Sequence, residues 1–381
     1  MAFHWQISNS STCSLLLTQW NQTQPDLDFD AAACLFRFML PSDTVVYVLM
    51  VVFLALSFLS VVVNGSTLFG LGHSRDLSWE PRFALLKNLI LNDLLLTFTQ
   101  SPTVLHCLLN RRTLAFDSWC LVQYFTGTVC ILCTLLTLTF MALERYVYVC
   151  HAIRYLQIIT LQRLRSIIGL IWIISLAIAV VNMVLLHMGR GTFGEATAGM
   201  LCEPDTVERH MGFPRAAAIF RKLIGVVFIL GCILSYSFSY IRMYQEACNA
   251  VEPFNCVNSR ARKTVLFYGS MFVVQLVPCW IKIASDGLWE MEGTVSMVIS
   301  PALASSETPV PHRALPSNIA GALHISLLAL ILVPPCINPL IYGIRNREVR
   351  EAVLRFCQLR HRIRLIPLGG GGLSAQGNRG K

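Results

Sequence analysis

The stretch Cys120–Cys150, CLVQYFTGTVCILCTLLTLTFMALERYVYVC, decides the fold class of this chain. It is apolar from Leu121 to Leu143, which is long enough for a helix to cross a bilayer, and it then ends in Glu144, Arg145 and Tyr146. Charged side chains at the mouth of such a segment either lie at the membrane interface or face a protein interior with their charge partnered. Arg145 is therefore a candidate functional residue, and an ordinary interfacial arginine is the alternative.

The composition of the chain is that of a membrane protein. Hydrophobic residues make up 55% of the 381 residues and charged residues only 13%, whereas soluble domains are usually about 25% charged. We expect an all-α fold, a bundle of seven transmembrane helices, because the length accommodates seven membrane-length segments with modest loops. These segments are residues 44–71, 83–109, 120–149, 167–188, 216–244, 263–288 and 317–344.

Four regions are expected along the chain. Residues 1–43 form an N-terminal tail, 44–344 the seven-helix domain, 345–358 a short amphipathic helix on the membrane surface, and 359–381 a disordered, Gly-rich tail. Arg and Lys gather in alternate loops and near the C-terminus, a pattern that places those loops in the cytoplasm and the N-terminus outside. Two N-x-S/T triplets, at Asn9 and Asn21, are then on the side where glycosylation occurs.

Polar residues occur within three of the expected spans. Asn64, Asp93 and Asn338 lie at similar depth, where isolated polar groups are penalised, so they must face the interior of the bundle. They could satisfy one another with water or a sodium ion, or Asp93 could be a structural residue that joins helices. Sodium is the one possible cofactor that the sequence suggests.

Several motifs in this order resemble the rhodopsin-like (class A) G-protein-coupled receptors. Leu89–Asp93 is similar to the L-x-x-x-D of the family, and Glu144-Arg145-Tyr146 matches E/D-R-Y. Asn338-Pro339-Leu340-Ile341-Tyr342 matches N-P-x-x-Y in full, and Asn64 and Trp172 stand where the family has its first-helix asparagine and fourth-helix tryptophan. Within the family, residues 141–146, 235–236, 259–264 and 335–349 are similar to odorant receptors, particularly the fish-type branch and related orphan receptors.

The resemblance implies a receptor that activates a heterotrimeric G protein and carries out no catalysis. Arg145 would exchange its partner Glu144 for contacts in an opened cavity, with the hydroxyls of Tyr236 and Tyr342 steadying the open form. The activation set implied by the resemblance is Glu144, Arg145, Tyr146, Tyr236, Asn338, Pro339 and Tyr342. Because residues 258–263 contain no acid to pair with Arg145, appreciable basal signalling is expected.

The resemblance also implies covalent features. A disulfide would join Cys120 to Cys202, and Cys357 would be palmitoylated. Cys13 and Cys34 could form a second bridge or remain free thiols.

A ligand cavity is implied between spans three, five, six and seven. Gly127 stands where amine receptors carry an aspartate, and the Pro278-Cys279-Trp280 order departs from the C-W-x-P of the family. A small neutral or hydrophobic ligand is therefore expected, with ordinary core packing as the alternative for each single residue. The candidate contacts are Gly127, Thr128, Ile131, Phe220, Cys279, Ile283, His324 and Leu328.

Other functions remain open at this level. An orphan receptor for an endogenous lipid or peptide is the alternative to an odorant-like receptor. A transporter would favour broken helices paired across an internal repeat, a pattern that the sequence does not show apart from Asp93.

Overall fold

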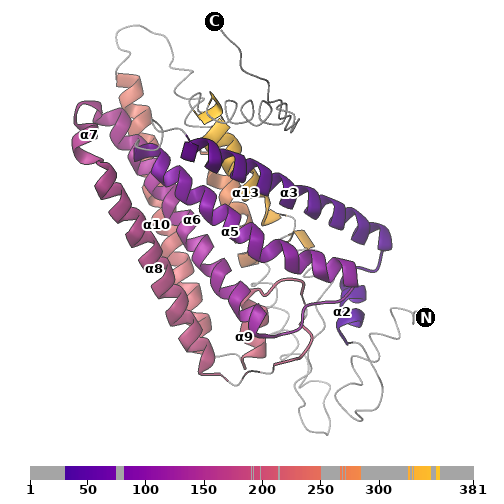
Figure 1. Cartoon of the computed structure of the whole chain (residues 1–381). Coiled ribbons are helices and arrows are strands. Elements are labelled where there is room, and N and C mark those ends of the chain that lie inside the picture. Colours follow the sequence, from indigo (N-terminus) through magenta and orange to yellow (C-terminus); the bar gives the residue numbers. More distant parts are fainter. Residues whose placement is uncertain are drawn as a thin grey trace, which may run out of the picture.

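A computed structural model of the chain describes residues 31–73, 81–189, 191, 193–197, 199–212, 215–249, 267, 269–270, 272–284, 325–326, 328, 330–344 and 349–351. The described part is a bundle of long helices (Figure 1). The longest helices are α3 (Asp43–His73), α5 (Pro81–Asn110), α6 (Ser118–Cys150), α8 (Leu161–His187) and α10 (Arg215–Asn249). The shorter elements are α2 (Ala31–Met39), η1 (Ala152–Arg154), α7 (Tyr155–Ile158), α9 (Pro204–His210), an unlabelled helix Phe272–Ala284, α13 (Val333–Asn338) and the π-helical turn η3 (Pro339–Ile344).

Helix α6 lies at the centre of the bundle. It packs against α5, α8 and α10, while α3 packs on α5, and α13 contacts both α3 and α5. The residues of α6 suit this position because small or apolar side chains such as Gly127, Cys130, Cys133 and Ala142 are buried on several of its sides. Asp117 is the N-cap of this helix, because its carboxylate accepts a hydrogen bond from the Cys120 backbone N–H at 2.9 Å.

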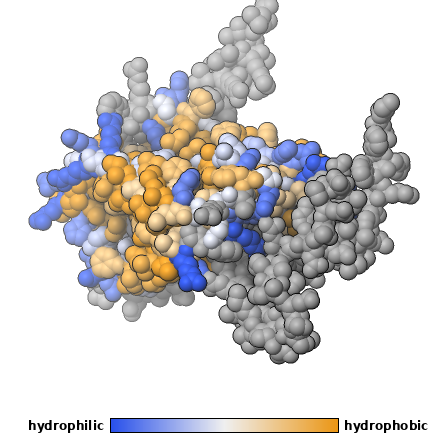
Figure 2. Space-filling view, turned by 90° about the horizontal axis from the view of Figure 1, so that it is seen from below, coloured by the Kyte–Doolittle hydropathy of each residue, from blue (hydrophilic) through white to orange (hydrophobic). Residues whose placement is uncertain are grey.

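Four of the described helices, α3, α6, α8 and α10, are long and apolar enough to cross a membrane. Helix α5 is not among them, because its buried side is rich in polar residues, which lower its average hydropathy. Large apolar side chains are exposed on the outward faces, for example Phe58 on α3 and Leu234 on α10. Figure 2 shows apolar side chains over much of the face seen, with hydrophilic side chains mainly toward its margins.

Hydrogen bonds between helices supplement the packing. Ser57 donates to Ser101 at 2.9 Å, and Ser60 and Thr97 share a bond of 2.8 Å, so α3 and α5 are joined at two successive turns. Lipid tails are as apolar as leucine, which leaves packing and such bonds to hold membrane helices together, at roughly 0.5–1.5 kcal/mol per bond.

The two ends of the bundle differ. Figure 1 shows α2 and α9 at one end and α7 at the other. We call the first the disulfide end, because Cys120 and Cys202 are bridged there, and the second the Arg145 end. At the disulfide end, Phe36 of α2 and Leu40 just after it are buried among residues of α3 and α5, so part of the expected N-terminal tail is a packed helix.

The boundaries of α3, α5, α6 and α10 agree with the first, second, third and fifth expected spans within about five residues, and much of the sixth and seventh expected spans lies outside the described residues. The exception is the fourth span, α8. This helix begins at Leu161, six residues before the expected start at Ile167. Thr160 caps it by accepting a hydrogen bond from the Arg163 N–H at 3.3 Å, and its first turns carry Arg163 and Arg165. These basic residues ended the apolar pattern in the sequence but not the helix.

Candidate functional site

A polar connection crosses the middle of the bundle. The Asn338 side-chain amide donates to the Asp93 carboxylate at 2.9 Å, and Gln275 donates to the side-chain oxygen of Asn338. All three side chains are buried. The connection joins α5, α13 and the helix Phe272–Ala284, so a displacement of any one of them disturbs hydrogen bonds between buried polar groups, which is costly.

Asn64 has a different role from the one expected. Its amide donates to the Pro335 carbonyl at 2.8 Å and, within its own helix, to the Ser60 carbonyl at 2.9 Å. Asn64 therefore joins α3 to α13, whereas the sequence had suggested a contact with Asp93. Its side-chain oxygen has no hydrogen-bond partner within the part of the chain that the structure describes. Asp93 and Asn338 are therefore brought together as expected, and Asn64 reaches the same region through the backbone of α13.

Trp172 links three helices. Its indole N–H donates to the Asn88 side-chain oxygen at 2.8 Å, and the Asn88 amide donates to the Thr137 hydroxyl at the same distance. Thus α8, α5 and α6 are held in register by one chain of hydrogen bonds. Asn88 gave no signal in the sequence beyond being a polar residue within a span.

At the Arg145 end, the two charged residues of the E-R-Y motif have separate hydroxyl partners. Arg145 Nη1 donates to Tyr240 Oη on α10 at 3.1 Å, and Tyr155 Oη donates to Glu144 Oε1 at 2.7 Å. Tyr146 packs edge-on to His151 and tilted against Phe238. The arginine that the sequence singled out is thus placed between α6 and α10, half-buried and hydrogen-bonded.

Tyr236 lies one helical turn before Tyr240. Its ring stacks on that of Tyr240 with centroids 4.5 Å apart, and on Phe272 at 4.0 Å. These rings form a buried cluster with Leu135 and Leu276, so α6, α10 and the helix Phe272–Ala284 pack closely here. The sequence motifs indicate Tyr236 and not Tyr240, although the Ser-Tyr pair recurs at Ser239-Tyr240 four residues later.

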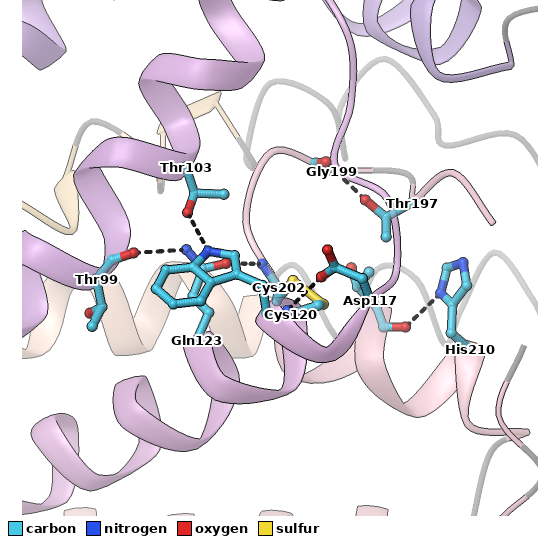
Figure 3. The surroundings of a disulfide bond; sticks show 11 residues. Thr99, Thr103, Asp117, Cys120, Gln123, Thr197, Gly199, Cys202 and His210 are labelled. Atoms are coloured by element: carbon cyan, nitrogen blue, oxygen red, sulfur yellow. Dashed lines mark hydrogen bonds between the residues drawn. A yellow bond between two sulfur atoms is a disulfide. The ribbon is translucent and has the colours of Figure 1, made fainter. Parts of the chain in front are cut away.

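The disulfide end holds the loop after α8 against α6. The expected bridge between Cys120 and Cys202 is present, with the two Cα atoms 5.3 Å apart. Figure 3 shows Gln123 beside it: its side-chain oxygen accepts from the Cys202 N–H at 3.2 Å, and its amide donates to the Thr99 carbonyl at 3.4 Å. Backbone bonds also join the loop to residues 114–116, among them Phe116 N–H to the Glu195 carbonyl at 2.8 Å.

The predicted ligand contacts are spread over three kinds of position. Gly127 is buried, and a Cβ atom at this position would lie 3.3 Å from Gln100 Nε2. The side chains of Thr128, Phe220 and Cys279 are half-buried. Ile131 and Ile283 are exposed, at 42% and 48%. Leu328 is fully buried in an apolar cluster with residues of α3 and α5, which is the environment of a core residue.

Some predictions fall outside the described residues. These are the glycosylation sites Asn9 and Asn21, the ligand contact His324, the palmitoylation site Cys357 and the side chain of Tyr342. Cys34 is disulfide-bonded, and its bridging cysteine also lies outside them.

Two comparisons with known proteins bear on this arrangement. Residues 63–342 match the family model described as 7 transmembrane receptor (rhodopsin family). The chain is 23% identical to human olfactory receptor 2AG1 over 78% of its own length and 84% of that protein, and 26% identical to human olfactory receptor 2D2 over 78% and 86%. It is 22% identical to gorilla olfactory receptor 1G1 over 74% and 80%. These relatives are mammalian, so the narrower expectation of a fish-type branch stays a prediction.

Proposed function

Because the chain belongs to the rhodopsin family of seven-transmembrane receptors, we propose that it is a chemosensory receptor that binds a small neutral or hydrophobic molecule and activates a heterotrimeric G protein. The observation that supports this most is the contact of Arg145 with Tyr240, which puts the charge of the E-R-Y motif between two helices instead of at the lipid surface. The likeness to olfactory receptors supports the chemosensory part. The family consists of receptors, and the chain is accordingly not an enzyme.

The proposed orientation places the disulfide end outside the cell and the Arg145 end in the cytoplasm. Disulfides form in the oxidising lumen of the endoplasmic reticulum, the side of the membrane that becomes the cell exterior, and a bridge at Cys120 therefore belongs on that side. The basic loops and the two glycosylation triplets of the N-terminal tail support the same orientation. The receptor is then multi-pass in the plasma membrane, with the G protein at Arg145.

The ligand is proposed to bind beside α6 at the level of Thr128 and Ile131. Ile131 lies on the same face as Leu135, one turn away, and Leu135 is buried against α10 and the helix Phe272–Ala284. Ile131 is thus an exposed side chain on a face that otherwise packs inward, as expected of a residue that lines an open space between helices. No carboxylate stands at Gly127 to anchor an amine, so apolar contact would dominate binding.

Transmission through the bundle is proposed to use the buried polar connection. A ligand that contacts helix Phe272–Ala284 can bias the bond of Gln275 to Asn338 and, through it, Asp93. The arrangement has the parts of a two-state switch: two distant sites and a packed core between them. A sodium ion is the cation proposed at the Asp93 carboxylate, with Asn64 as a neutral ligand, since its side-chain oxygen has no hydrogen-bond partner among the described residues.

The test of this proposal is a panel of odorants applied to cells that express the chain, with cAMP and calcium as readouts. Replacing Ile131 with alanine should weaken the response to active compounds about tenfold or more, since burying an isoleucine side chain against a ligand contributes roughly 1.5–3 kcal/mol. The matched control is Ile173→Ala on α8, where the side chain is 64% exposed on an outward face and no loss is expected. Equal potency of wild type and Ile131→Ala for every active compound would place the binding site elsewhere.

A further inference from the structure

A cluster of charged side chains lies at the disulfide end, beyond the residues discussed so far. Arg221 of α10 binds Glu208 through Nε at 2.7 Å and Asp205 through Nη2 at 3.1 Å. Lys282 of the helix Phe272–Ala284 binds Glu203 at 2.8 Å and also Asp205. We call these five residues, Glu203, Asp205, Glu208, Arg221 and Lys282, the ion-pair cluster.

The cluster connects three parts of the fold through one short helix. Its carboxylates come from α9 and from Glu203, which directly precedes it, while the two cations come from α10 and from the helix Phe272–Ala284. Asp205 contacts both cations and so bridges the two helices. Figure 1 shows α9 at the end of the bundle where α10 begins.

The base of the cluster is fixed to α6. Cys202, the residue before Glu203, is bridged to Cys120, and Val207 on α9 is fully buried with Phe116 and Leu186. The carboxylates are therefore anchored to α6, separately from the helix Phe272–Ala284 that carries Lys282. Any shift of Lys282 away from the disulfide end must break its ion pairs with Glu203 and Asp205.

Most side chains of these pairs are more buried than those of ordinary surface pairs, and Asp205, at 37% exposed, is the least buried of them. The side chains of Arg221 and Lys282 are only 18% and 17% exposed, and that of Glu208 only 6%. By contrast, the pair between Arg111 and Asp43 at the same end has side chains that are 53% and 65% exposed. Solvent screens exposed pairs and leaves them little net stabilising effect, whereas removing one partner of a desolvated pair is costly.

Lys282 is also placed where the helix can bend. Pro278 lies one turn before it and removes a backbone donor within the helix, which is a usual cause of a kink. On the other side of Pro278, Phe272 and Leu276 are buried against α6 and α10, and Gln275 binds Asn338. The helix is thus held in the middle of the bundle by packing and at its far end by the ion-pair cluster.

We propose that the ion-pair cluster is a latch that holds the segment after Pro278 against α9 and α10, and that its strength sets how easily the bundle leaves the closed arrangement. Contacts that exist in only one arrangement shift the equilibrium toward it by their full differential free energy. Weakening the latch therefore populates the open arrangement without ligand. The link to signalling rests on the proposed receptor function, whereas the mechanical part of the proposal does not.

The test compares Lys282→Gln with Arg111→Gln, which removes a charge from the exposed pair at the same end. Hydrogen–deuterium exchange of the purified receptor should rise about fivefold or more in the segment 279–284 of Lys282→Gln and stay unchanged in Arg111→Gln. Basal nucleotide exchange at matched surface expression should rise by a similar factor in Lys282→Gln and stay unchanged in Arg111→Gln. Glu203→Gln should change both quantities in the same direction but less, because it leaves the pair between Lys282 and Asp205. The double variant Glu203→Gln with Lys282→Gln should differ little from Lys282→Gln, because Lys282→Gln already removes the contact with Glu203.

The outcomes separate the latch from the receptor function. Unchanged hydrogen exchange in a Lys282→Gln variant that folds would overturn the latch. If the wild type signals, faster hydrogen exchange in Lys282→Gln with unchanged basal activity would also overturn it. If the wild type activates no G protein but Lys282→Gln shows faster hydrogen exchange, the latch would be supported as a mechanical element and the proposed function would be overturned.

Discussion

Replacing Cys202 with serine should remove most of the receptor from the cell surface. The bridge to Cys120 closes a loop with a sequence separation of 82, and losing a disulfide of this kind typically costs about 2–5 kcal/mol. The lost stability affects a packed region, because Cys202, Cys120 and Met211 belong to one buried cluster. The measurement is antibody staining of an N-terminal epitope tag on intact cells, together with the Tm of detergent-solubilised protein.

The control for this prediction is Cys150→Ser. Cys150 is a free, half-buried cysteine at the opposite end of the same helix, and its replacement should leave the surface level and Tm close to those of the wild type. If Cys202→Ser reached the wild-type surface level with an unchanged Tm, the bridge would have no structural role.

Replacing Arg145 with alanine should abolish signalling while leaving the receptor on the surface. The guanidinium is held at Tyr240, and removing it deletes the charge of the E-R-Y motif that this proposal assigns to G-protein activation. Cells with matched surface expression should show the cAMP and calcium levels of mock-transfected cells, both at rest and with active compounds. Arg154→Ala, in the exposed η1 segment at the same end, should signal normally.

Two tyrosine variants show which hydroxyl assists Arg145. Tyr240→Phe keeps the stacked ring but removes the bond to Arg145, and a hydrogen bond to a charged group contributes about 1.5–3 kcal/mol, so a loss of roughly tenfold or more in potency is expected. Tyr236→Phe should have the smaller effect. The reverse order would favour the assignment of Tyr236 made from the sequence.

The sequence predicted the features that depend on one segment at a time. Apolar length located the long helices, and the E-R-Y and N-P-x-x-Y motifs marked Arg145 and Asn338, which the structure places in contact with Tyr240 and Asp93. The cysteine bridge followed from the family resemblance alone. The start of α8 was missed because basic residues interrupt the hydropathy but are compatible with a helix.

The remaining contacts depend on how the helices are rotated against each other. Gln275 lies in apolar surroundings of the sequence, and Tyr240 belongs to a repeated Ser-Tyr pair. Only the packing shows that Gln275 meets Asn338 and that Tyr240 meets Arg145. The ion-pair cluster joins residues up to 79 positions apart, and a loop of mixed charge gave no reason to pair Lys282 with Glu203. Periodicity within a helix identifies its buried face but not the residue that lies opposite.

The most direct test of the receptor assignment is guanine-nucleotide exchange in membranes that contain the chain and a heterotrimeric G protein. The proposed function predicts that exchange exceeds that of mock membranes and rises further with at least one compound of an odorant panel. Exchange equal to that of mock membranes, for every G-protein class and every compound, with the chain confirmed at the surface, would contradict it.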